Sequence, residues 1–223
     1  MAERVLDMEN LHVSFDTYAG EVKAVRGVTL HVDEGEVLAI VGESGCGKST
    51  FLKLLLRYWE KDGGTIAYNG SDVDMINSAS LLNNVTMVSQ STYLFDESIE
   101  ENLRIARPDA TREELESACR MASVHDFILS LPEGYGTRVG AMGDNLSAGE
   151  KQRIGLARAF LRGSELILLD EPTSNVDSIN EGMILKSLAE HGKSVILVSH
   201  RESTMAIADR IYRVKDGVMT EER

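Results

Sequence analysis

The chain is poor in cysteine and has no long apolar run, and each shortage excludes a class of protein. Its 223 residues include only two cysteines, Cys46 and Cys119, which make neither a disulfide framework nor a metal-ligand cluster. The strongest apolar runs, residues 37–41 and 166–169, are far shorter than the ~20 residues that a membrane-spanning helix needs. The first ten residues are charged and lack the apolar core of a signal peptide. We therefore expect a cytoplasmic protein that reaches any membrane through partners.

Positive charge is also in the minority. The chain has 23 lysines and arginines against 36 aspartates and glutamates, which gives a formal net charge of −13. This balance argues against a broad basic face for nucleic acid, so no nucleic-acid partner is expected, although one small basic pocket remains compatible with it. With 43% hydrophobic and 26% charged residues, the chain can form one sizeable domain, or a core with an inserted lobe.

Short apolar segments and segments of helical spacing alternate along the chain. Strands are predicted at residues 11–15, 28–32, 37–41, 63–68, 85–88, 166–169, 195–198 and 211–214. Helices are predicted at 49–58, 147–161, 179–189 and 202–208, and the pattern is helical from 98 to about 130, where Thr111 and Glu114 read as a capping box. The chain is thus expected to be an α/β protein with a mainly parallel sheet, an N-terminal antiparallel β portion and an inserted helical subdomain. The predicted domains are a core of residues 1–90 and 161–223 and a helical subdomain of residues 91–160.

A glycine-rich loop follows the apolar run at 37–41. Residues 42–49 read GESGCGKS, which fits G-x-x-x-x-G-K-[ST] between a predicted strand and a predicted helix. Glycines let backbone N–H groups turn inward around phosphate oxygens, and the following helix adds the positive end of its dipole. Lys48 would reach the β- and γ-phosphates, and the Ser49 hydroxyl would ligate Mg²⁺. The predicted phosphate contacts are Gly42, Ser44, Gly45, Cys46, Gly47, Lys48, Ser49 and Thr50, with ATP and Mg²⁺ as cofactors.

Two acids end another apolar run. Residues 166–169 are followed directly by Asp170 and Glu171. Parallel sheets bind ligands at the carboxyl ends of their strands, which is where both carboxylates would lie. Asp170 suits a Mg²⁺ ligand, directly or through water, and Glu171 suits a base for the attacking water. Strands also end in acids simply because the chain reaches solvent. The phosphate loop is therefore what favours a catalytic role for Asp170 and Glu171.

A third motif lies between these two. Residues 146–153 read LSAGEKQR, which resembles the signature of ATP-binding cassette (ABC) proteins, usually Leu-Ser-Gly-Gly-Gln. Other elements of that family follow in the expected order: Gln90 as the Q-loop glutamine, residues 174–177 as the D-loop and His200 as the switch histidine. The resemblance covers essentially the whole chain and implies a P-loop ATPase core whose helical subdomain carries the signature.

The resemblance also implies a mechanism. In ABC ATPases two cassettes enclose two ATP molecules head to tail, so Ser147 and Gly149 would reach the γ-phosphate held by a second nucleotide-binding subunit, of the same or a different chain. His200 would contact the γ-phosphate, and Gln90 the metal and the attacking water. The implied catalytic residues are Lys48, Gln90, Glu171 and His200, and the implied metal ligands are Ser49, Gln90 and Asp170.

Two further assignments follow from the resemblance. An aromatic residue before the second strand usually stacks on adenine, and Tyr18 is the best candidate, with Phe15 as its competitor. The remaining histidines are expected to be solvated or structural: His12, His31, His125 and His191.

The signature departs from the family at two positions. Ala148 replaces the usual first glycine, and Glu150 replaces the usual glutamine. An extra methyl group would crowd the loop, and an extra carboxylate is unfavourable close to a triphosphate. Either an asymmetric heterodimer with one poor site or harmless variation would explain both changes.

Different motifs of the chain resemble cassettes that transport in opposite directions. Residues 90–102, 131–137 and 199–204 resemble exporter cassettes, whereas residues 22–32 and 41–45 resemble peptide-importer cassettes. We expect an ATP-hydrolysing, exporter-type subunit that drives a substrate across a membrane through a separate transmembrane partner, and that is peripheral on its cytoplasmic face. The alternatives are an importer-type subunit and a soluble ABC ATPase that acts on a macromolecular complex.

Overall fold

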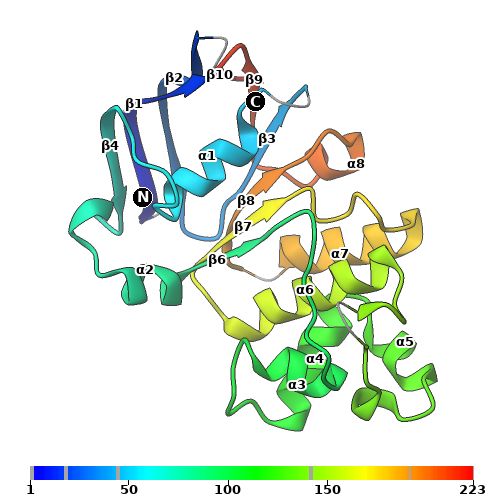
Figure 1. Cartoon of the computed structure of the whole chain (residues 1–223). Helices are drawn as coiled ribbons and strands as arrows, with labels where there is room; N and C mark the ends of the chain where they lie inside the picture. The colour runs from blue at the N-terminus through cyan, green and yellow to red at the C-terminus, as the bar shows by residue number, and fades with distance from the viewer. Residues whose placement is uncertain (1–2, 18–19, 44–45, 141–142, 191, 223) are drawn as a thin grey trace. The chain divides into compact units, whose positions relative to one another are not determined.

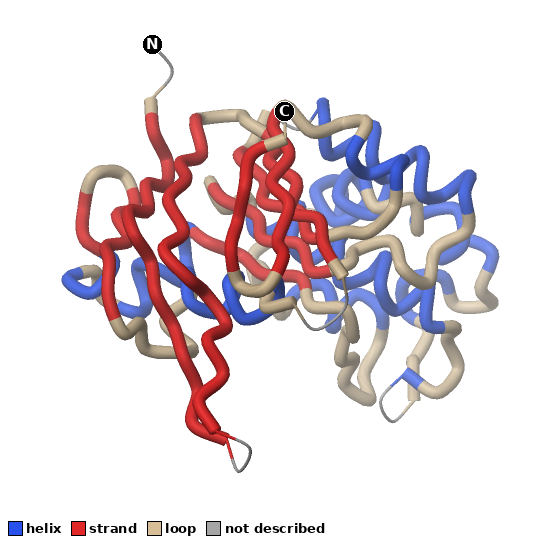
Figure 2. Tube along the Cα trace, turned by 90° about the horizontal axis from the view of Figure 1, so that it is seen from above, coloured by secondary structure: helices blue, strands red, loops and turns tan. Residues whose placement is uncertain are grey.

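The computed structural model of the chain describes residues 3–17, 20–43, 46–140, 143–190 and 192–222. Their contacts form two compact units, the first of residues 1–85, 165–170 and 192–223 and the second of residues 86–164 and 171–191. Figure 1 traces the elements of both units, and Figure 2 colours them by secondary structure. The predicted α/β class is confirmed, because the first unit holds an antiparallel sheet and a mostly parallel one. The domain boundaries drawn from the sequence stay a prediction.

The antiparallel sheet is built on two long strands. Its order is β2-β1-β4-β5, with β1 (Arg4–Thr17), β2 (Gly20–Asp33), β4 (Gly63–Tyr68) and β5 (Ser71–Asp72). The sequence pattern predicted only short strands at 11–15 and 28–32. The β1–β2 register shifts between Met8 and Leu11, and Asn10 there has a φ of 48°. Such irregularities break the apolar alternation while the pairing continues, which explains why the pattern underestimated both strands.

The mostly parallel sheet carries the strands that the phosphate loop and the acidic pair follow. In the first unit its order is β10-β9-β3-β8-β7, with β3 (Val37–Gly42), β7 (Leu166–Asp170), β8 (Ser194–Val198), β9 (Arg210–Lys215) and β10 (Val218–Glu221). All residues of β7 and β8 are buried, as their uninterrupted apolar sequences indicated. Strand β10 pairs antiparallel with β9 and is mostly exposed, so it lacks an apolar signal and was not predicted.

The described residues of the first unit include the helices α1 (Lys48–Leu55), α2 (Ser78–Asn84) and α8 (Glu202–Met205). Helix α1 ends before the predicted residue 58 because Arg57 has a φ of 57° and the Tyr58 N–H bonds the Lys53 carbonyl at 2.9 Å, which closes the helix with a left-handed turn. Helix α8 ends before the predicted residue 208. There the backbone N–H of Asp209 donates to the Val37 carbonyl at 2.8 Å, so the chain is already fixed beside β3.

The second unit is mainly helical, and β6 (Val85–Val88) leads into it. It contains α3 (Ile99–Arg104), α4 (Arg112–Met121), α5 (His125–Ser130), α6 (Ala148–Arg162) and α7 (Ser178–Glu190). Three of these helices start with a reciprocal capping box, namely Ser98 with Glu101, Thr111 with Glu114 and Ser147 with Glu150. The predicted capping box at Thr111 is therefore confirmed. In the part of the chain that the structure describes, no helix is long and apolar enough to span a bilayer.

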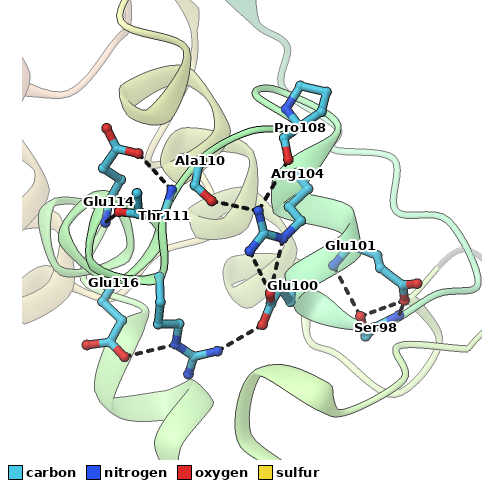
Figure 3. A network of polar contacts seen from close by, with 10 residues as sticks. Ser98, Glu100, Glu101, Arg104, Pro108, Ala110, Thr111, Glu114 and Glu116 are labelled. Carbon is cyan, nitrogen blue, oxygen red and sulfur yellow. Dashed lines mark hydrogen bonds and ion pairs between the residues drawn. The ribbon is translucent and has the colours of Figure 1, made fainter.

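A network of arginines and glutamates joins α3 to α4 (Figure 3). The Glu100 carboxylate accepts hydrogen bonds from Arg104 at 2.9 Å and from Arg112 at 2.9 Å. Arg104 also donates to the Ala110 carbonyl at 2.6 Å, and the Arg112 guanidinium lies 4.0 Å above the Tyr135 ring. Exposed ion pairs contribute little one by one, so the bonds to backbone and ring matter most here. They fix the loop between the two helices.

Candidate active site

The phosphate loop joins β3 to α1, and its lysine folds back onto the loop. Lys48 is buried, and its Nζ donates to the carbonyl oxygens of Gly42 at 2.7 Å and Glu43 at 2.6 Å. The same nitrogen lies 3.5 Å from Cys46 Sγ. The ammonium is thus held at the backbone of the loop by weak neutral acceptors that an anion would outcompete. The predicted contacts Ser44 and Gly45 lie outside the described residues.

Two glycines of this loop have no room for a side chain. A Cβ on Gly42 would lie 2.5 Å from the Val214 carbonyl oxygen and 2.8 Å from Cys46 Sγ. Gly47 is the N-cap of α1 with a φ of 102°, and a Cβ there would lie 2.6 Å from the Ala24 carbonyl oxygen. The loop is therefore a cradle of bare backbone at a helix N-terminus, where unpaired N–H groups favour anions. These features fit the phosphates of ATP.

The carboxyl ends of β3, β7 and β8 meet at one edge of the first unit's sheet. Val198 of β8 pairs with Ile40 of β3 on one side and with Asp170 of β7 on the other. The phosphate loop and Asp170, which is 8% exposed, therefore belong to the same edge. Residues that follow β8, beginning with Ser199, continue this edge.

A fixed turn after β8 carries His200. Ser199 donates its N–H to the Ile40 carbonyl at 3.2 Å, and its hydroxyl donates to Thr204 Oγ1 at 3.2 Å. The Ser199 oxygen also accepts the Arg201 N–H at 3.1 Å. These bonds hold the turn, while the His200 side chain is exposed. The predicted switch histidine therefore lies in the turn that continues this sheet edge, and its role stays a prediction.

The donor set of the same edge fits Mg²⁺. The Asp170 carboxylate ends β7, and the Ser49 hydroxyl lies in the first turn of α1. Mg²⁺ takes oxygen ligands, typically one or two carboxylates with phosphate oxygens and water. Among the described residues no group of three or more histidines, cysteines and acids could hold a metal alone. Phosphate oxygens of a nucleotide are ligands of the kind that would accompany Ser49 and Asp170.

In the second unit the predicted base and the Q-loop glutamine lie together. The Gln90 side-chain amide donates to Glu171 Oε2 at 3.2 Å. Glu171 has a φ of 50°, a left-handed conformation that costs a non-glycine residue on the order of 1 kcal/mol and that clusters at functional sites. The strained backbone and the Gln90 contact together fix the direction of the Glu171 carboxylate.

The signature turn shows why one glycine is retained and the other replaced. A Cβ on Gly149 would lie 2.5 Å from the Asn175 carbonyl oxygen of the D-loop, whereas the neighbouring Ala148 is exposed. Ser147 is the exposed N-cap of α6, and its Oγ accepts the Glu150 N–H at 3.3 Å. The Glu150 carboxylate turns back to accept the Ser147 N–H at 2.7 Å. The unusual carboxylate therefore closes its own helix.

The D-loop ends at the start of α7, where Asp177 binds the first helical turn. The Asn180 side-chain amide donates to Asp177 Oδ2 at 2.6 Å, and the backbone N–H groups of Ile179 and Asn180 donate to Oδ1 at 3.1 Å each. The Asn180 side-chain bond, followed by its backbone bond, lowers the pKa of Asp177 below the usual range. Asp177 is thus an ionised cap that fixes the end of the D-loop.

The adenine contact is not defined by the described residues. Tyr18 lies outside them, as does His191. Its competitor Phe15 packs edge-on against Trp59, with ring centroids 5.2 Å apart. The stacking role of Tyr18 therefore stays a prediction. The structural reading of His125 agrees with its buried position and its 2.9 Å contact with the Tyr135 hydroxyl.

Sequence reasoning missed a groove of about 410 Å³ in the second unit. Tyr93, Phe95 and Ile105 line it and are 55%, 49% and 53% exposed. The two aromatic rings pack edge-on at 5.0 Å. Arg158 donates to the Tyr93 carbonyl and to Asn102 Oδ1, both at 2.7 Å, and burial lowers the pKa of Arg158 to about 10. An exposed aromatic rim on a fixed backbone is typical of an interaction surface.

Comparisons with known proteins agree on one family. The family model described as ABC transporter matches residues 25–174. A probable ABC transporter ATP-binding/permease protein of Haemophilus influenzae is 52% identical over 217 residues, which are 96% of this chain and 39% of that protein. The human ATP-binding cassette sub-family B member 6 is 42% identical over 218 residues, which are 97% of this chain and 26% of that protein. A solved structure of a bacterial Atm1-family ABC exporter with ATP bound matches with a TM-score of 0.92 at 33% identity, over 99% of this chain and 39% of that one.

The chain belongs to the ABC transporter family, as its motifs implied. Its similarity is to an ABC transporter ATP-binding/permease protein and to an ABC exporter, which agrees with the expected exporter-type cassette. None of these three proteins is named as an importer, so the comparisons give no support to the importer-like segments at residues 22–32 and 41–45. The chain spans less than two fifths of the length of each of these relatives.

Proposed function

We propose that the chain binds Mg·ATP and hydrolyses it, and that two such cassettes close head to tail around ATP to drive export across a membrane. The observation that carries this proposal is the glycine-lined cradle between β3 and α1. Lys48 is held inside it by the carbonyls of Gly42 and Glu43, and Asp170 ends β7 and His200 follows β8 at the same sheet edge. This combination is suited to a triphosphate and its metal.

The first unit holds the nucleotide. Backbone N–H groups of residues 42–50 bind the phosphates, and Lys48 exchanges its carbonyl partners for β- and γ-phosphate oxygens, to which an ammonium binds more strongly. Ser49 and Asp170 would hold Mg²⁺, which when bound would neutralise charge on the transferring phosphoryl group. His200 donates a hydrogen bond to the γ-phosphate from the turn after β8. Tyr18 stacks on the adenine.

Glu171 and Gln90 are the groups that act in hydrolysis. Glu171 accepts a proton from the attacking water, and Gln90, which bonds the Glu171 carboxylate at 3.2 Å, orients that water and contacts the metal. The strained φ of Glu171 keeps its carboxylate in one direction without reorganisation during the reaction.

A second nucleotide-binding subunit completes each site. Ser147 is exposed at the start of α6, and Gly149 leaves the first turn of that helix uncluttered. The N-terminus of α6 therefore faces outward with unpaired N–H groups suited to the γ-phosphate bound by the other subunit. Each subunit thus contributes its signature turn to the partner's ATP.

The groove in the second unit docks a transmembrane partner at the cytoplasmic face of the membrane. Its rim of Tyr93, Phe95 and Ile105 is apolar and exposed. The Haemophilus influenzae relative is named as an ATP-binding/permease protein, and most of its length lies outside the match to this chain. A segment of such a permease part would cover these side chains, because burial of apolar surface drives association.

The test is the Mg·ATPase rate of the purified chain over a range of protein concentrations. The specific rate should rise with concentration, because a site needs two subunits, and Glu171→Gln should abolish turnover while retaining ATP and favouring a dimer. Lys48→Ala should lose ATP binding in calorimetry. If Glu171→Gln hydrolyses ATP at the wild-type rate, Glu171 is not the base. If Lys48→Ala binds ATP normally, the cradle is not the nucleotide site.

A further inference from the structure

A buried glutamine joins the signature helix to the segment that starts at Glu171. Gln152 lies in α6 and is 1% exposed. Its Nε2 donates to the backbone carbonyl of Glu171 at 2.7 Å and lies 3.4 Å from Ser174 Oγ. Its Oε1 accepts the backbone N–H of Asn175 at 3.2 Å. A single side chain therefore binds the backbone at both ends of residues 171–175.

The bond to Glu171 acts where the backbone is strained. A left-handed φ of 50° at a non-glycine residue persists only when its surroundings hold it. The Glu171 carbonyl accepts two hydrogen bonds, from Gln152 and from the Ser174 N–H at 3.2 Å. These bonds fix the peptide plane after Glu171 and thereby the direction of its side chain toward Gln90.

The same segment touches α6 at a second point, in the signature itself. The Asn175 carbonyl lies where a Cβ on Gly149 would be only 2.5 Å away, while the Asn175 N–H is bonded to Gln152. Residues 171–175 therefore follow α6 at two positions three residues apart on the helix. Positions at that spacing share one helix face, so both contacts are made by the same face of α6.

We propose that Gln152 is a positioning residue that couples the signature turn to the base Glu171 of the same chain. This rests on the proposed function, in which the signature turn meets one ATP and Glu171 acts on the other. Capture of a γ-phosphate at the start of α6 displaces the helix slightly, and Gln152 carries the displacement to the backbone of Glu171. The two ATP sites of the dimer are thereby coupled through one side chain in each subunit.

Glutamine suits this position because it has a donor and an acceptor at one end. In Gln152→Glu the volume and the acceptor for Asn175 remain, but a carboxylate oxygen replaces the donor to the Glu171 carbonyl and meets it unpaired. In Gln152→Met the volume remains and both bonds are lost. A matched control is Lys186→Gln on α7, because it changes the net charge by the same amount at a side chain that is 74% exposed.

The experiment measures the Mg·ATPase of the purified chain together with ATP binding in the absence of Mg²⁺ and the thermal midpoint. For Gln152→Glu we expect kcat to fall by at least about tenfold, since small misplacements of catalytic groups have large effects on rate, with ATP affinity within about twofold of wild type. The dependence of rate on ATP should lose its cooperativity, with the Hill coefficient falling to about 1. Gln152→Met should show the same separation of kcat from affinity, and Lys186→Gln should match wild type.

The outcomes separate this inference from the function on which it rests. If wild type hydrolyses ATP and Gln152→Glu or Gln152→Met keeps both its kcat and its cooperativity, the coupling role is wrong. A fall in kcat only in proportion to ATP affinity or to the folded fraction also overturns it. If wild type itself neither binds nor hydrolyses ATP, the proposed function fails, whatever Gln152 does.

Discussion

The contact between Gly149 and the D-loop makes one substitution especially informative. Gly149→Ala would place a Cβ 2.5 Å from the Asn175 carbonyl oxygen, a separation that real Cβ atoms essentially never show. An ordinary carbon–oxygen contact is about 3.3 Å, so the methyl group overlaps the oxygen by roughly 0.8 Å, and overpacking of this kind costs typically about 1–3 kcal/mol. Either α6 or the D-loop must shift.

The matched control is Gly182→Ala in α7. No atom lies within 4 Å of the position of its Cβ, and the residue is exposed within the helix. Replacing a helical glycine by alanine there should raise the free energy of unfolding by about 0.5–1 kcal/mol, because alanine has the higher helix propensity. Two identical substitutions on neighbouring segments of the second unit should thus have effects of opposite sign.

The assays are urea unfolding and ATP-dependent dimerisation in the Glu171→Gln background. We expect Gly149→Ala to lower the unfolding midpoint and to weaken the ATP-bound dimer by about tenfold or more, since 1.4 kcal/mol corresponds to a factor of ten. ATP binding by the monomer should remain, because Lys48 and the phosphate loop are untouched. If Gly149→Ala unfolds and dimerises like Gly182→Ala, the close approach of Asn175 is not a property of the protein, and the reasoning fails.

Three further predictions concern thiols, pH and the groove. In the native chain a maleimide should label the partly exposed Cys46 and spare Cys119, because burial raises the pKa of the Cys119 thiol to about 11. ATP should protect Cys46 from the maleimide, and labelling of both thiols without denaturant would contradict the prediction. The Tyr68 hydroxyl donates to Glu165 at 2.6 Å and lowers the pKa of Glu165, so Tyr68→Phe should lower the free energy of unfolding by about 1 kcal/mol at neutral pH in urea. A carboxyl whose pKa is lowered by folding contributes stability above its unfolded pKa, and this contribution is lost as the pH falls through its folded pKa. The difference in stability between Tyr68→Phe and wild type should therefore shrink in acid, and a difference that stays constant with pH would refute the link. Phe95 lies on the exposed rim of the groove, so Phe95→Ala should change the free energy of unfolding by no more than about 0.5 kcal/mol and leave ATP binding unchanged. The substitution should weaken co-purification with membrane-domain partners. Unaltered co-purification would exclude the groove as their docking surface.

The fold could be predicted where local signals agree with tertiary contacts. The unbroken apolar runs in the sequence predict the fully buried strands β7 and β8, and the capping box at Thr111 predicts the start of α4. The long β1–β2 pair could not be read in full, because its register shifts interrupt the alternation. Strand β10 could not be read at all, since an exposed polar strand depends on its partner for its structure.

The candidate site divides in the same way. Motifs with fixed spacing could be located from the sequence. The loop at Lys48 and the acid Asp170 were expected at the carboxyl ends of strands, and Glu171 directly after them. Gln152 carries no such signal, because a glutamine within a helix reads as solvent-exposed and only the packing of residues 171–175 buries it. The aromatic groove likewise carries no sequence signal, because Tyr93 and Arg158, which line it, are far apart in the sequence and meet only after folding.

The capping box at the start of α6 has an evolutionary consequence. Glutamate and glutamine serve equally at its third helical position, because either side chain can accept the Ser147 N–H. Descendants of one gene can therefore exchange Glu150 for glutamine without unfolding the helix, and each exchange alters the charge at the start of α6, which in the proposed function faces a second subunit's nucleotide. In a pair of duplicated cassettes, a substitution at this position has little effect on folding stability. One member of the pair can therefore diverge in its use of ATP while both keep the same fold.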